Sequence, residues 1–229
     1  MFFLTDEIWF PPVHTASPEG ILAIGGDLSV ERLLLAYRSG IFPWFNEGDP
    51  PTWWAPDPRY IIEPEELRVR KGLEKIIRQQ KFEVTIDKAF DRVIAACAES
   101  KRQGGPGTWI TDDMITAYCK LHEMGFAHSV ESWLEGELAG GLYGICIGKC
   151  FFGESMFYKV TNSSKVAFVT LVRKLAELEF KLVDCQMPSE HLKSFGAKGV
   201  PRDMFLKMMA EGRVIPSEIQ EPVSLEMML

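Results

Sequence analysis

The chain has 229 residues, 46% of them hydrophobic and 25% charged, which fits a globular protein with one large domain or one ordinary domain plus a small one. The formal net charge of −7 argues against binding nucleic acid over the whole surface but leaves room for a local basic patch. No apolar run approaches the roughly 18 residues that a membrane helix needs, and the N-terminus carries acids where a signal peptide carries basic residues, so we expect a cytoplasmic protein.

The first 58 residues are dense in proline and aromatic residues, as in FPPV, GIFPWF and DPPTWWAPDPR. Within this stretch SVERLLLAYRSG predicts one short helix, with Ser29 as its N-cap and Gly40 just past its end. Prolines on both sides favour rigid loops elsewhere. We therefore predict a small N-terminal module, residues 1–58, built from one helix and rigid loops.

Residues 59–229 alternate between helical and strand-like patterns. Helices are predicted at 71–80, at 87–100 with Asp87 as cap, at 111–125 with Thr111 as cap, at 163–178 and from Pro201 on, and strands at 82–86, 127–134, 138–147, 150–157 and 180–186. The three central strands are expected to form a meander, because Glu135-Gly136 and Gly148-Lys149 supply the turns. This order predicts an α+β fold in which helices flank a mainly antiparallel sheet.

The last predicted strand, FKLVDCQ, begins like a core strand and then carries Asp184 and Gln186. Side chains alternate faces along a strand, so these two groups are expected on one face. A second acid, Glu154, interrupts the aromatic strand FFGESMF. Because an unpaired buried carboxylate is costly or has a raised pKa, two such acids in one sheet suggest a polar cavity. The alternatives are a solvent-exposed strand end, a structural hydrogen bond or an ion pair.

Metal and thiol chemistry are poorly supported by the spacing of the candidate residues. His122 and His128 in HEMGFAH are six apart rather than four, and Gly125 ends the helix between them. The five cysteines include no CxxC pair, which fits reduced, mostly buried thiols. Alternation places Cys185 on the face opposite the neighbouring acid, so a cysteine nucleophile is not expected. We predict no metal site.

The predicted meander and the helix after it resemble the arrangement in acyl-CoA N-acyltransferases of the GNAT type. Those enzymes hold the CoA pyrophosphate on backbone amides of a glycine-containing turn before that helix. The matching stretch here, FGESMFYKVTNSSK, has no such turn. We therefore expect an acyltransferase-like domain over residues 59–229 that uses an acyl donor other than CoA and no cofactor.

Aromatic and basic residues point to contact with a nucleic acid. Four tryptophans fall in predicted loops, where they either plug the loop against the core or offer a platform for a stacked base: Trp44, Trp53, Trp54 and Trp109. Three basic residues share one face of a predicted helix: Lys71, Lys75 and Arg78. Such a ridge is either a solvated helix face or a footprint for a nucleic-acid backbone, and its closeness to the tryptophans favours the footprint.

Several further stretches carry a family resemblance. They are LAIGGDLSVERLLLAYRSGIFPWF, WWAPDPR, GTWIT, AHSVESW, AGGLYGI, FFGESMF, NSSK, VDCQ and SFGA. In this order, over residues 11–205, they resemble the bacterial leucyl/phenylalanyl-tRNA–protein transferases. Tyr158, where the family usually has a small residue, and the Met-Pro pair after VDCQ are departures that concern local pocket contacts.

The resemblance implies transfer of leucine or phenylalanine from aminoacyl-tRNA to a protein with an N-terminal lysine or arginine, the tagging step of the bacterial N-end degradation pathway. It also implies that the basic ridge lies on a tRNA-contacting helix. The expected partners are the charged tRNA and the acceptor protein, with no membrane, and we expect a monomer. By the same resemblance, the residues that match the family's donor and catalytic sites are Trp44, Trp109, Phe151, Glu154, Met156, Asp184 and Gln186.

An aminoacyl ester needs no further activation, so we expect the positioning of a neutral amine to supply most of the rate. The Gln186 oxygen is expected to align that amine while Asp184 polarises the contact or takes the proton. Alternatively, Asp184 and Glu154 bind the cationic side chain of the acceptor. An acyl-CoA-dependent N-acyltransferase and a non-catalytic RNA- or peptide-binding module are the competing functions. The expected apolar slot for the donor consists of Leu142, Phe151, Met156 and Leu171.

Overall fold

The computed structural model describes residues 1–100, 110–217, 221–223 and 225 and contains two sheets. The smaller sheet, in the order β1-β2-β4-β3, consists of β1 (Phe2–Leu4), β2 (Ile21–Gly25), β4 (Thr52–Trp54) and β3 (Phe42–Pro43). Helix α1 (Val30–Arg38) lies between β2 and β3 in sequence. The prediction of one helix and rigid loops is therefore incomplete, because strands this short carry no alternation that would reveal them.

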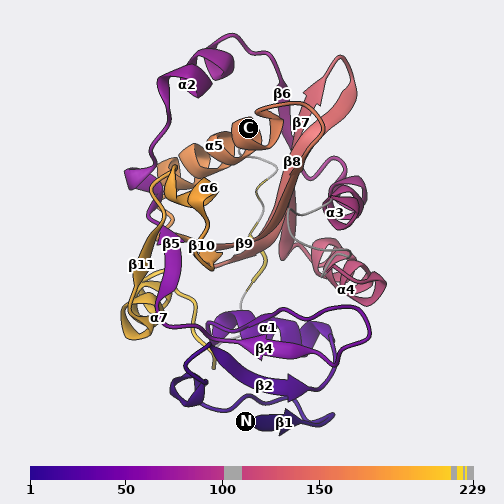
Figure 1. Cartoon of the computed structure of the whole chain (residues 1–229), viewed down its shortest axis with the longest axis vertical. Helices are drawn as coiled ribbons and strands as arrows, with labels where there is room; N and C mark the ends of the chain where they lie inside the picture. The colour runs from indigo at the N-terminus through magenta and orange to yellow at the C-terminus, as the bar shows by residue number, and fades with distance from the viewer. Residues whose placement is uncertain (101–109, 218–220, 224, 226–229) are drawn as a thin grey trace.

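The larger sheet has the strand order β11-β5-β10-β9-β8-β7-β6 (Figure 1). Its strands are β5 (Arg59–Ile62), β6 (Glu83–Ile86), β7 (Ala127–Leu134), β8 (Glu137–Ile147), β9 (Cys150–Tyr158), β10 (Leu182–Gln186) and β11 (Lys198–Val200). Neighbouring strands are antiparallel except β9 and β10, which run parallel because the chain crosses back between them through a helix. The predicted α+β class with a mainly antiparallel sheet is confirmed.

Helices cover both faces of the larger sheet. They are α2 (Lys71–Arg78), α3 (Phe90–Glu99), α4 (Asp112–Glu123), α5 (Ser163–Glu177), α6 (Glu190–Lys193) and α7 (Arg202–Glu211), with short 3-10 turns η1 (Val13–Thr15) and η2 (Pro64–Glu66). Helices α3 and α4 lie on one face and α5 on the other (Figure 1). Within the described ranges, no helix combines the length and the apolar character that crossing a membrane requires.

The predicted helix caps are partly correct. The hydroxyls of Ser29 and Thr111 accept first-turn N–H groups of α1 and α4, as predicted. Asp87 does not cap α3, whose N-cap is Ala89. Asp87 instead adopts a left-handed conformation and accepts a hydrogen bond from the N–H of Ser129, because the neighbouring strand offers its carboxylate a donor.

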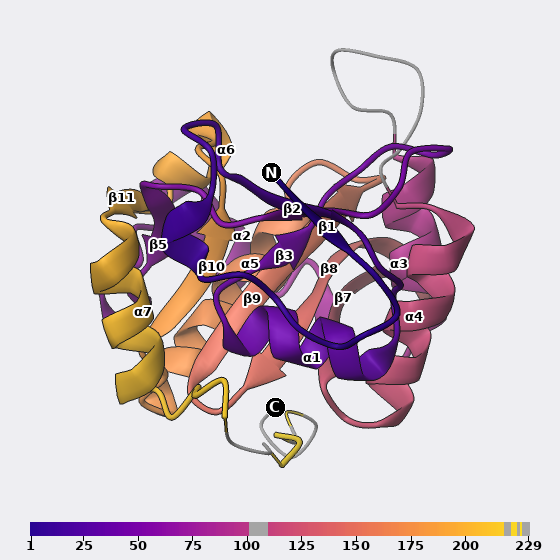
Figure 2. The same ribbon diagram turned by 90° about the horizontal axis from the view of Figure 1, so that it is seen from below.

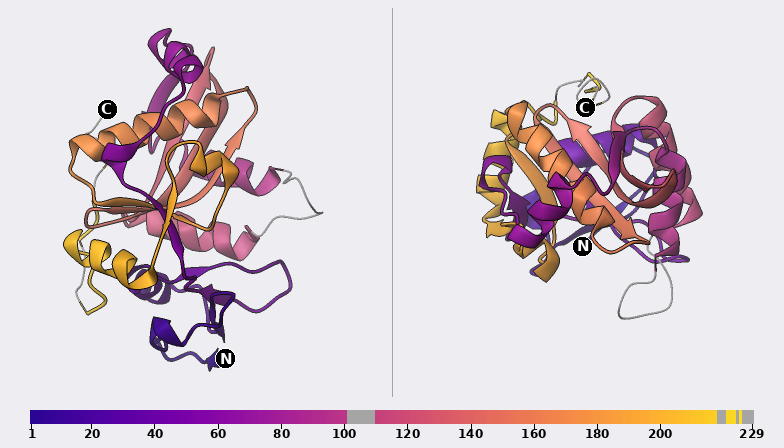
Figure 3. Two further views of the ribbon diagram at one scale, coloured as in Figure 1. Left: turned by 60° about the vertical axis from the view of Figure 1, so that its left-hand side comes forward. Right: turned by 90° about the horizontal axis from the view of Figure 1, so that it is seen from above.

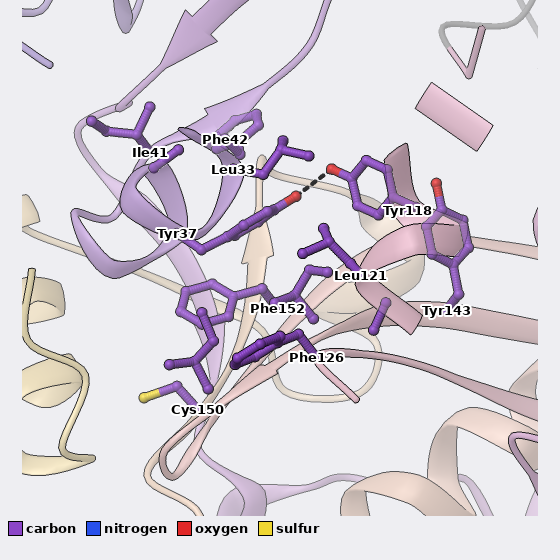
Figure 4. Close-up of a cluster of buried hydrophobic side chains, with 14 of the residues drawn as sticks. Leu33, Tyr37, Ile41, Phe42, Tyr118, Leu121, Phe126, Tyr143, Cys150 and Phe152 are labelled. Carbon is purple, nitrogen blue, oxygen red and sulfur yellow. Dashed lines mark hydrogen bonds between the residues drawn. The ribbon is translucent and has the colours of Figure 1, made fainter. Parts of the chain in front are cut away.

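The N-terminal module and the larger sheet share one hydrophobic core. Figure 4 shows Leu33 and Tyr37 of α1 near Tyr118 of α4 and Phe152 of β9, and all four side chains are completely buried. Figure 2 shows the same junction from below, with α1 beside α4. Because burying one large apolar side chain contributes roughly 1.5–3 kcal/mol, this junction holds the module firmly against the sheet.

Candidate active site

A cavity of about 440 Å³ opens beside the parallel strands β9 and β10. Its walls come from β3 and the following Trp44, from β8 and β9, from α5, and from the end of β10 together with the segment that leads into α6. It therefore lies where the N-terminal module meets the larger sheet. Glu154, Asp184 and Gln186, the polar residues that stood out in the sequence, all line it.

Glu154 is a buried acid in the cavity wall, with 7% of its surface exposed. Its carboxylate accepts hydrogen bonds from the Tyr37 hydroxyl (2.8 Å), the Tyr118 hydroxyl (3.2 Å) and the Gln186 amide nitrogen (2.9 Å). The two phenols are also hydrogen-bonded to each other. Burial raises the pKa of Glu154 to about 7, with a smaller contribution from the charge of Asp184, although the three hydrogen bonds lower it. Glu154 can therefore exchange a proton near neutral pH.

Asp184 is completely buried and forms an ion pair with Arg59, which is also buried. Arg59 Nε donates to Asp184 Oδ1 at 2.8 Å and Arg59 Nη2 donates to Oδ2 at 2.6 Å. The guanidinium lies between the rings of Phe42 and Phe205, 4.6 and 4.7 Å from their centroids, and Nη1 donates to the Gly40 carbonyl at 3.2 Å. The negative charge of Asp184 is thus balanced inside the protein, and this acid makes the structural hydrogen bonds that the sequence left open.

Gln186 reaches Glu154 because β10 is irregular at its end. The register with β5 shifts between Asp184 and Gln186, and Gln186 has a φ of 61°. Its N–H donates to Asp184 Oδ1 at 2.9 Å, which stabilises this uncommon conformation. The simple alternation predicted for the strand is therefore wrong at this point, and Cys185 also lines the cavity. Burial raises the pKa of the Cys185 thiol, so this residue stays protonated and is a poor nucleophile.

The apolar part of the cavity contains most of the predicted donor slot. Leu171 is not part of the wall: it is buried in the core, and Phe168, three residues earlier on α5, lines the cavity instead. The ring of Phe151 lies against Gly144 of β8, where an added Cβ would come within 2.6 Å of the ring. The predicted slot residues that line the cavity are Leu142, Phe151 and Met156.

Trp44 lines the cavity and is 36% exposed, as a stacking platform needs to be. Its ring lies 5.4 Å from that of Trp54, whose Nε1 donates to the Trp44 carbonyl at 2.7 Å. Trp53 is completely buried, and its Nε1 donates to the Gly25 carbonyl at 2.9 Å. Trp53 and Trp54 belong to β4, so the prediction that they lie in loops is wrong. Trp109 lies outside the described residues.

Lys71, Lys75 and Arg78 are exposed on α2, so the predicted basic ridge is accessible. Arg78 Nε lies 3.6 Å from a carboxylate oxygen of Glu74 on the same helix. Figure 3 shows α2 at the end of the molecule opposite the N-terminus. The ridge therefore does not lie beside Trp44, as their closeness in sequence suggested, and only a large ligand can contact both.

The two histidines that invited a metal hypothesis both lie near Asp87. His128 Nδ1 is 2.6 Å from Asp87 Oδ2, and His122 Nδ1 is 3.8 Å from Oδ1. In the described part of the chain, no three His, Cys, Asp or Glu side chains are grouped as metal ligands. The hydrogen bond between His128 and Asp87 joins β7 to the end of β6 and serves the fold.

Several residues of the site carried no signal in the sequence. Tyr37 and Tyr118 belong to the buried faces of their helices, and Arg59 lies in the motif WWAPDPR without any local sign of its partner. His191 lines the cavity, and its buried Nε2 has no hydrogen-bond partner in the described ranges. Burial, together with the charge of Lys165, lowers the pKa of His191. Tyr37, Tyr118 and Arg59 reach the acids of the site through long-range contacts, which a local sequence pattern does not record.

Comparison with known proteins identifies relatives over nearly the whole chain. The model of the leucyl/phenylalanyl-tRNA protein transferase family matches residues 61–210. The model of this family's N-terminal domain matches residues 26–57. The leucyl/phenylalanyl-tRNA–protein transferase of Syntrophotalea carbinolica is 55% identical over 96% of this chain and 95% of its own length. That of Nitrosospira multiformis is 53% identical over 91% and 90%. A solved structure of L-PGS from Bacillus licheniformis has a TM-score of 0.42 at 11% identity, covering 86% of this chain and 73% of its own, which is too weak to define the fold.

Proposed function

The chain belongs to the family of leucyl/phenylalanyl-tRNA protein transferases and is an aminoacyltransferase, and we propose that its cavity joins leucine or phenylalanine from tRNA to the N-terminal lysine or arginine of an acceptor protein. The observation that carries this proposal is the meeting, in one cavity, of an apolar wall and the titratable carboxylate of Glu154. We further propose that the protein acts as a monomer in the cytoplasm, in the N-end degradation pathway.

The reaction is the aminolysis of an ester. A bond forms between the acceptor nitrogen and the aminoacyl carbonyl carbon, and the bond from that carbon to the ribose oxygen of the tRNA breaks. One proton leaves the amine and one proton reaches the ribose oxygen. An α-amino group has a pKa of about 7.7–8.0, so a base that titrates near neutral pH is well matched to it.

On the donor side, the apolar wall accepts the leucine or phenylalanine side chain. The wall residues are Leu142, Phe151 and Met156, and an unbranched methionine adapts its shape to both aliphatic and aromatic donors. The exposed ring of Trp44 at the cavity is suited to stack on a base of the tRNA end. By family resemblance, Trp109 is a second candidate for this contact.

On the acceptor side, Glu154 and Gln186 are the groups that meet the amine. The hydrogen-bond donors around Glu154 are two phenols and one amide, all neutral, so the carboxylate keeps its affinity for a cation or a proton. The Gln186 amide nitrogen points to Glu154, which leaves the amide oxygen as a hydrogen-bond acceptor for the amine. The sequence suggested that Asp184 takes the proton, or that Asp184 and Glu154 bind the acceptor's cation. We propose that Glu154 is the acid that meets the amine.

Two further features support the proposal. The β8–β9 hairpin is followed by α5 and then by β10, which lies parallel to β9, and this connection supports a GNAT-type acyltransferase domain over residues 59–229 behind an N-terminal module of residues 1–58. The exposed ridge on α2 supports contact with the tRNA body. Because α2 and the N-terminal module lie at opposite ends of the molecule, a ligand that contacts both has to be large (Figure 3).

The direct test is to incubate the purified protein with leucyl-tRNA or phenylalanyl-tRNA and a short peptide that begins with arginine. We expect a peptide longer by one leucine or phenylalanine, detected by mass, and no extension of the same peptide beginning with aspartate. Binding of charged tRNA without extension would instead identify a non-catalytic RNA-binding module. Extension driven by leucyl-CoA without tRNA would identify a CoA-dependent acyltransferase.

A further inference from the structure

We propose that Arg59 is a positioning residue for this reaction and acts through Asp184 on Gln186. Because Arg59 engages Asp184, the acid that exchanges a proton with the amine is Glu154. The inference rests on the proposed function. It changes the role that the sequence suggested for Asp184. Its basis is a chain of contacts that joins Arg59 to Asp184, to Gln186 and to Glu154.

The first contact, between Arg59 and Asp184, fixes the position of the Asp184 carboxylate. Two hydrogen bonds of 2.8 and 2.6 Å join its two carboxylate oxygens to Nε and Nη2 of Arg59, and neither side chain has more than 1% of its surface exposed. Losing either charge of a buried pair with this geometry leaves the other charge uncompensated. Both carboxylate oxygens of Asp184 are therefore engaged by Arg59, and taking a proton from a substrate would break this ion pair.

Arg59 is itself fixed in position and orientation. Its guanidinium is sandwiched between Phe42 of the N-terminal module and Phe205 of α7. Its third hydrogen bond goes to the carbonyl of Gly40. Only a planar group with several donors can make all these contacts at once, so lysine cannot replace arginine here.

The second contact, between Asp184 and Gln186, fixes the conformation of Gln186. Asp184 Oδ1 accepts both Arg59 Nε and the Gln186 N–H, at 2.8 and 2.9 Å. The second bond holds Gln186 in its left-handed conformation. In this conformation the Gln186 amide nitrogen lies 2.9 Å from Glu154 Oε1. Losing the anchor would let the strand end return to ordinary extended geometry, which turns the side chain away from Glu154.

A purely structural ion pair would predict a different outcome from a positioning pair. Replacing both members together, as Arg59→Met with Asp184→Leu, leaves no unpaired charge and so separates the loss of the pair from the cost of a buried ion. Arg59→Lys alone keeps the charge but not the two parallel hydrogen bonds. Arg32→Lys is the matched control, because Arg32 is also buried and also paired with an aspartate, Asp27, but does not line the cavity.

The experiment measures peptide extension, thermal unfolding and the affinity for a non-hydrolysable phenylalanyl-adenosine amide in each variant. We expect Arg59→Lys and the double variant to lose about 100-fold in kcat while binding the amide within threefold of wild type, because the apolar wall is intact. Arg32→Lys is expected to keep its kcat. Wild-type kcat in a folded Arg59→Lys protein, or in the folded double variant, would overturn the proposal.

The pH dependence gives a second, independent arm. The acidic limb of kcat against pH is expected to persist in Asp184→Asn, at a lower plateau and with its midpoint moved to lower pH, because the charge of Asp184 contributes to the raised pKa of Glu154. The limb is expected to be lost in Glu154→Gln. Loss of the limb in Asp184→Asn but not in Glu154→Gln would make Asp184 the proton acceptor and overturn the proposal. A wild-type protein that extends no peptide would refute the proposed function itself, a result distinct from either of these.

Discussion

The hydroxyl of Tyr37 donates a hydrogen bond of 2.8 Å to Glu154, and so joins α1 of the N-terminal module to β9 of the larger sheet. Tyr118 of α4 makes a second such bond to the same carboxylate. The acid at the centre of the site is therefore held by three parts of the chain that are far apart in sequence. Its proton affinity depends on the junction between module and sheet.

Removing one phenol tests this dependence. Each hydrogen bond from a phenol lowers the pKa of Glu154, which burial has raised to about 7, so Tyr37→Phe should raise that pKa further. The acidic limb of kcat against pH should then move to higher pH, with lower activity at pH 7. Tyr158→Phe serves as the control, because Tyr158 is 67% exposed. Identical profiles for Tyr37→Phe and wild type would separate Glu154 from the rate-limiting proton transfer.

The raised pKa of Glu154 also predicts how stability varies with pH. The folded protein keeps this proton up to about pH 7, whereas the unfolded chain releases it near the ordinary value of 4.5. Between these pH values the folded state binds more protons, so this residue lowers the free energy of unfolding as pH rises, by up to about 3 kcal/mol. Glu154→Gln should remove this loss and be more stable than wild type at pH 8, though inactive. Denaturant unfolding of both proteins from pH 5 to pH 8 measures the difference in unfolding free energy between Glu154→Gln and wild type. A difference that does not vary with pH would contradict this prediction.

Local sequence patterns predicted the elements with strong periodicity. The meander of β7, β8 and β9, the turns Glu135-Gly136 and Gly148-Lys149, and the caps Ser29 and Thr111 agree with the structure. In each case the signal lies within a few residues, in the alternation, the turn dipeptide or the capping hydroxyl. The strands of the N-terminal module gave no such signal because each has five residues or fewer.

Only those residues of the candidate site that are unusual in their sequence context could be predicted. An acid in an apolar strand marks itself, so Glu154 and Asp184 stood out. Arg59 did not stand out, because the sequence does not distinguish a buried arginine from an exposed one unless its partner is known. That partner, Asp184, lies 125 positions away. The same holds for Tyr118, whose place on the buried face of α4 predicts packing rather than a hydrogen bond to a carboxylate.

The donor slot predicts a contrast between two apolar residues, the partly buried Met156 and the buried Leu171. Met156 lines the cavity, so Met156→Ala should weaken contact with leucine and change the ratio of kcat/KM for leucyl-tRNA to phenylalanyl-tRNA by roughly tenfold in favour of the larger donor. Leu171 is buried outside the wall, so Leu171→Ala should cost about 2–5 kcal/mol in unfolding free energy and leave that ratio unchanged. Paired kinetic and unfolding measurements decide. Equal changes of the kcat/KM ratio in both variants would contradict the assignment of Met156 to the wall of the slot and of Leu171 to the core outside it.

The basic ridge on α2 predicts how tRNA binding responds to salt. Each lysine or arginine that contacts a phosphate releases counterions, so changing Lys71, Lys75 and Arg78 to glutamate should weaken binding and reduce the slope of log K against log salt by roughly two to three. The matched control changes three exposed lysines elsewhere to glutamate, with the same change in net charge: Lys88, Lys120 and Lys207. Binding of uncharged tRNA at several salt concentrations measures both sets. A long-range effect of net charge would weaken binding equally in the two sets, whereas direct contact reduces the slope only in the first. An unchanged slope after the first set would exclude α2 from the tRNA interface.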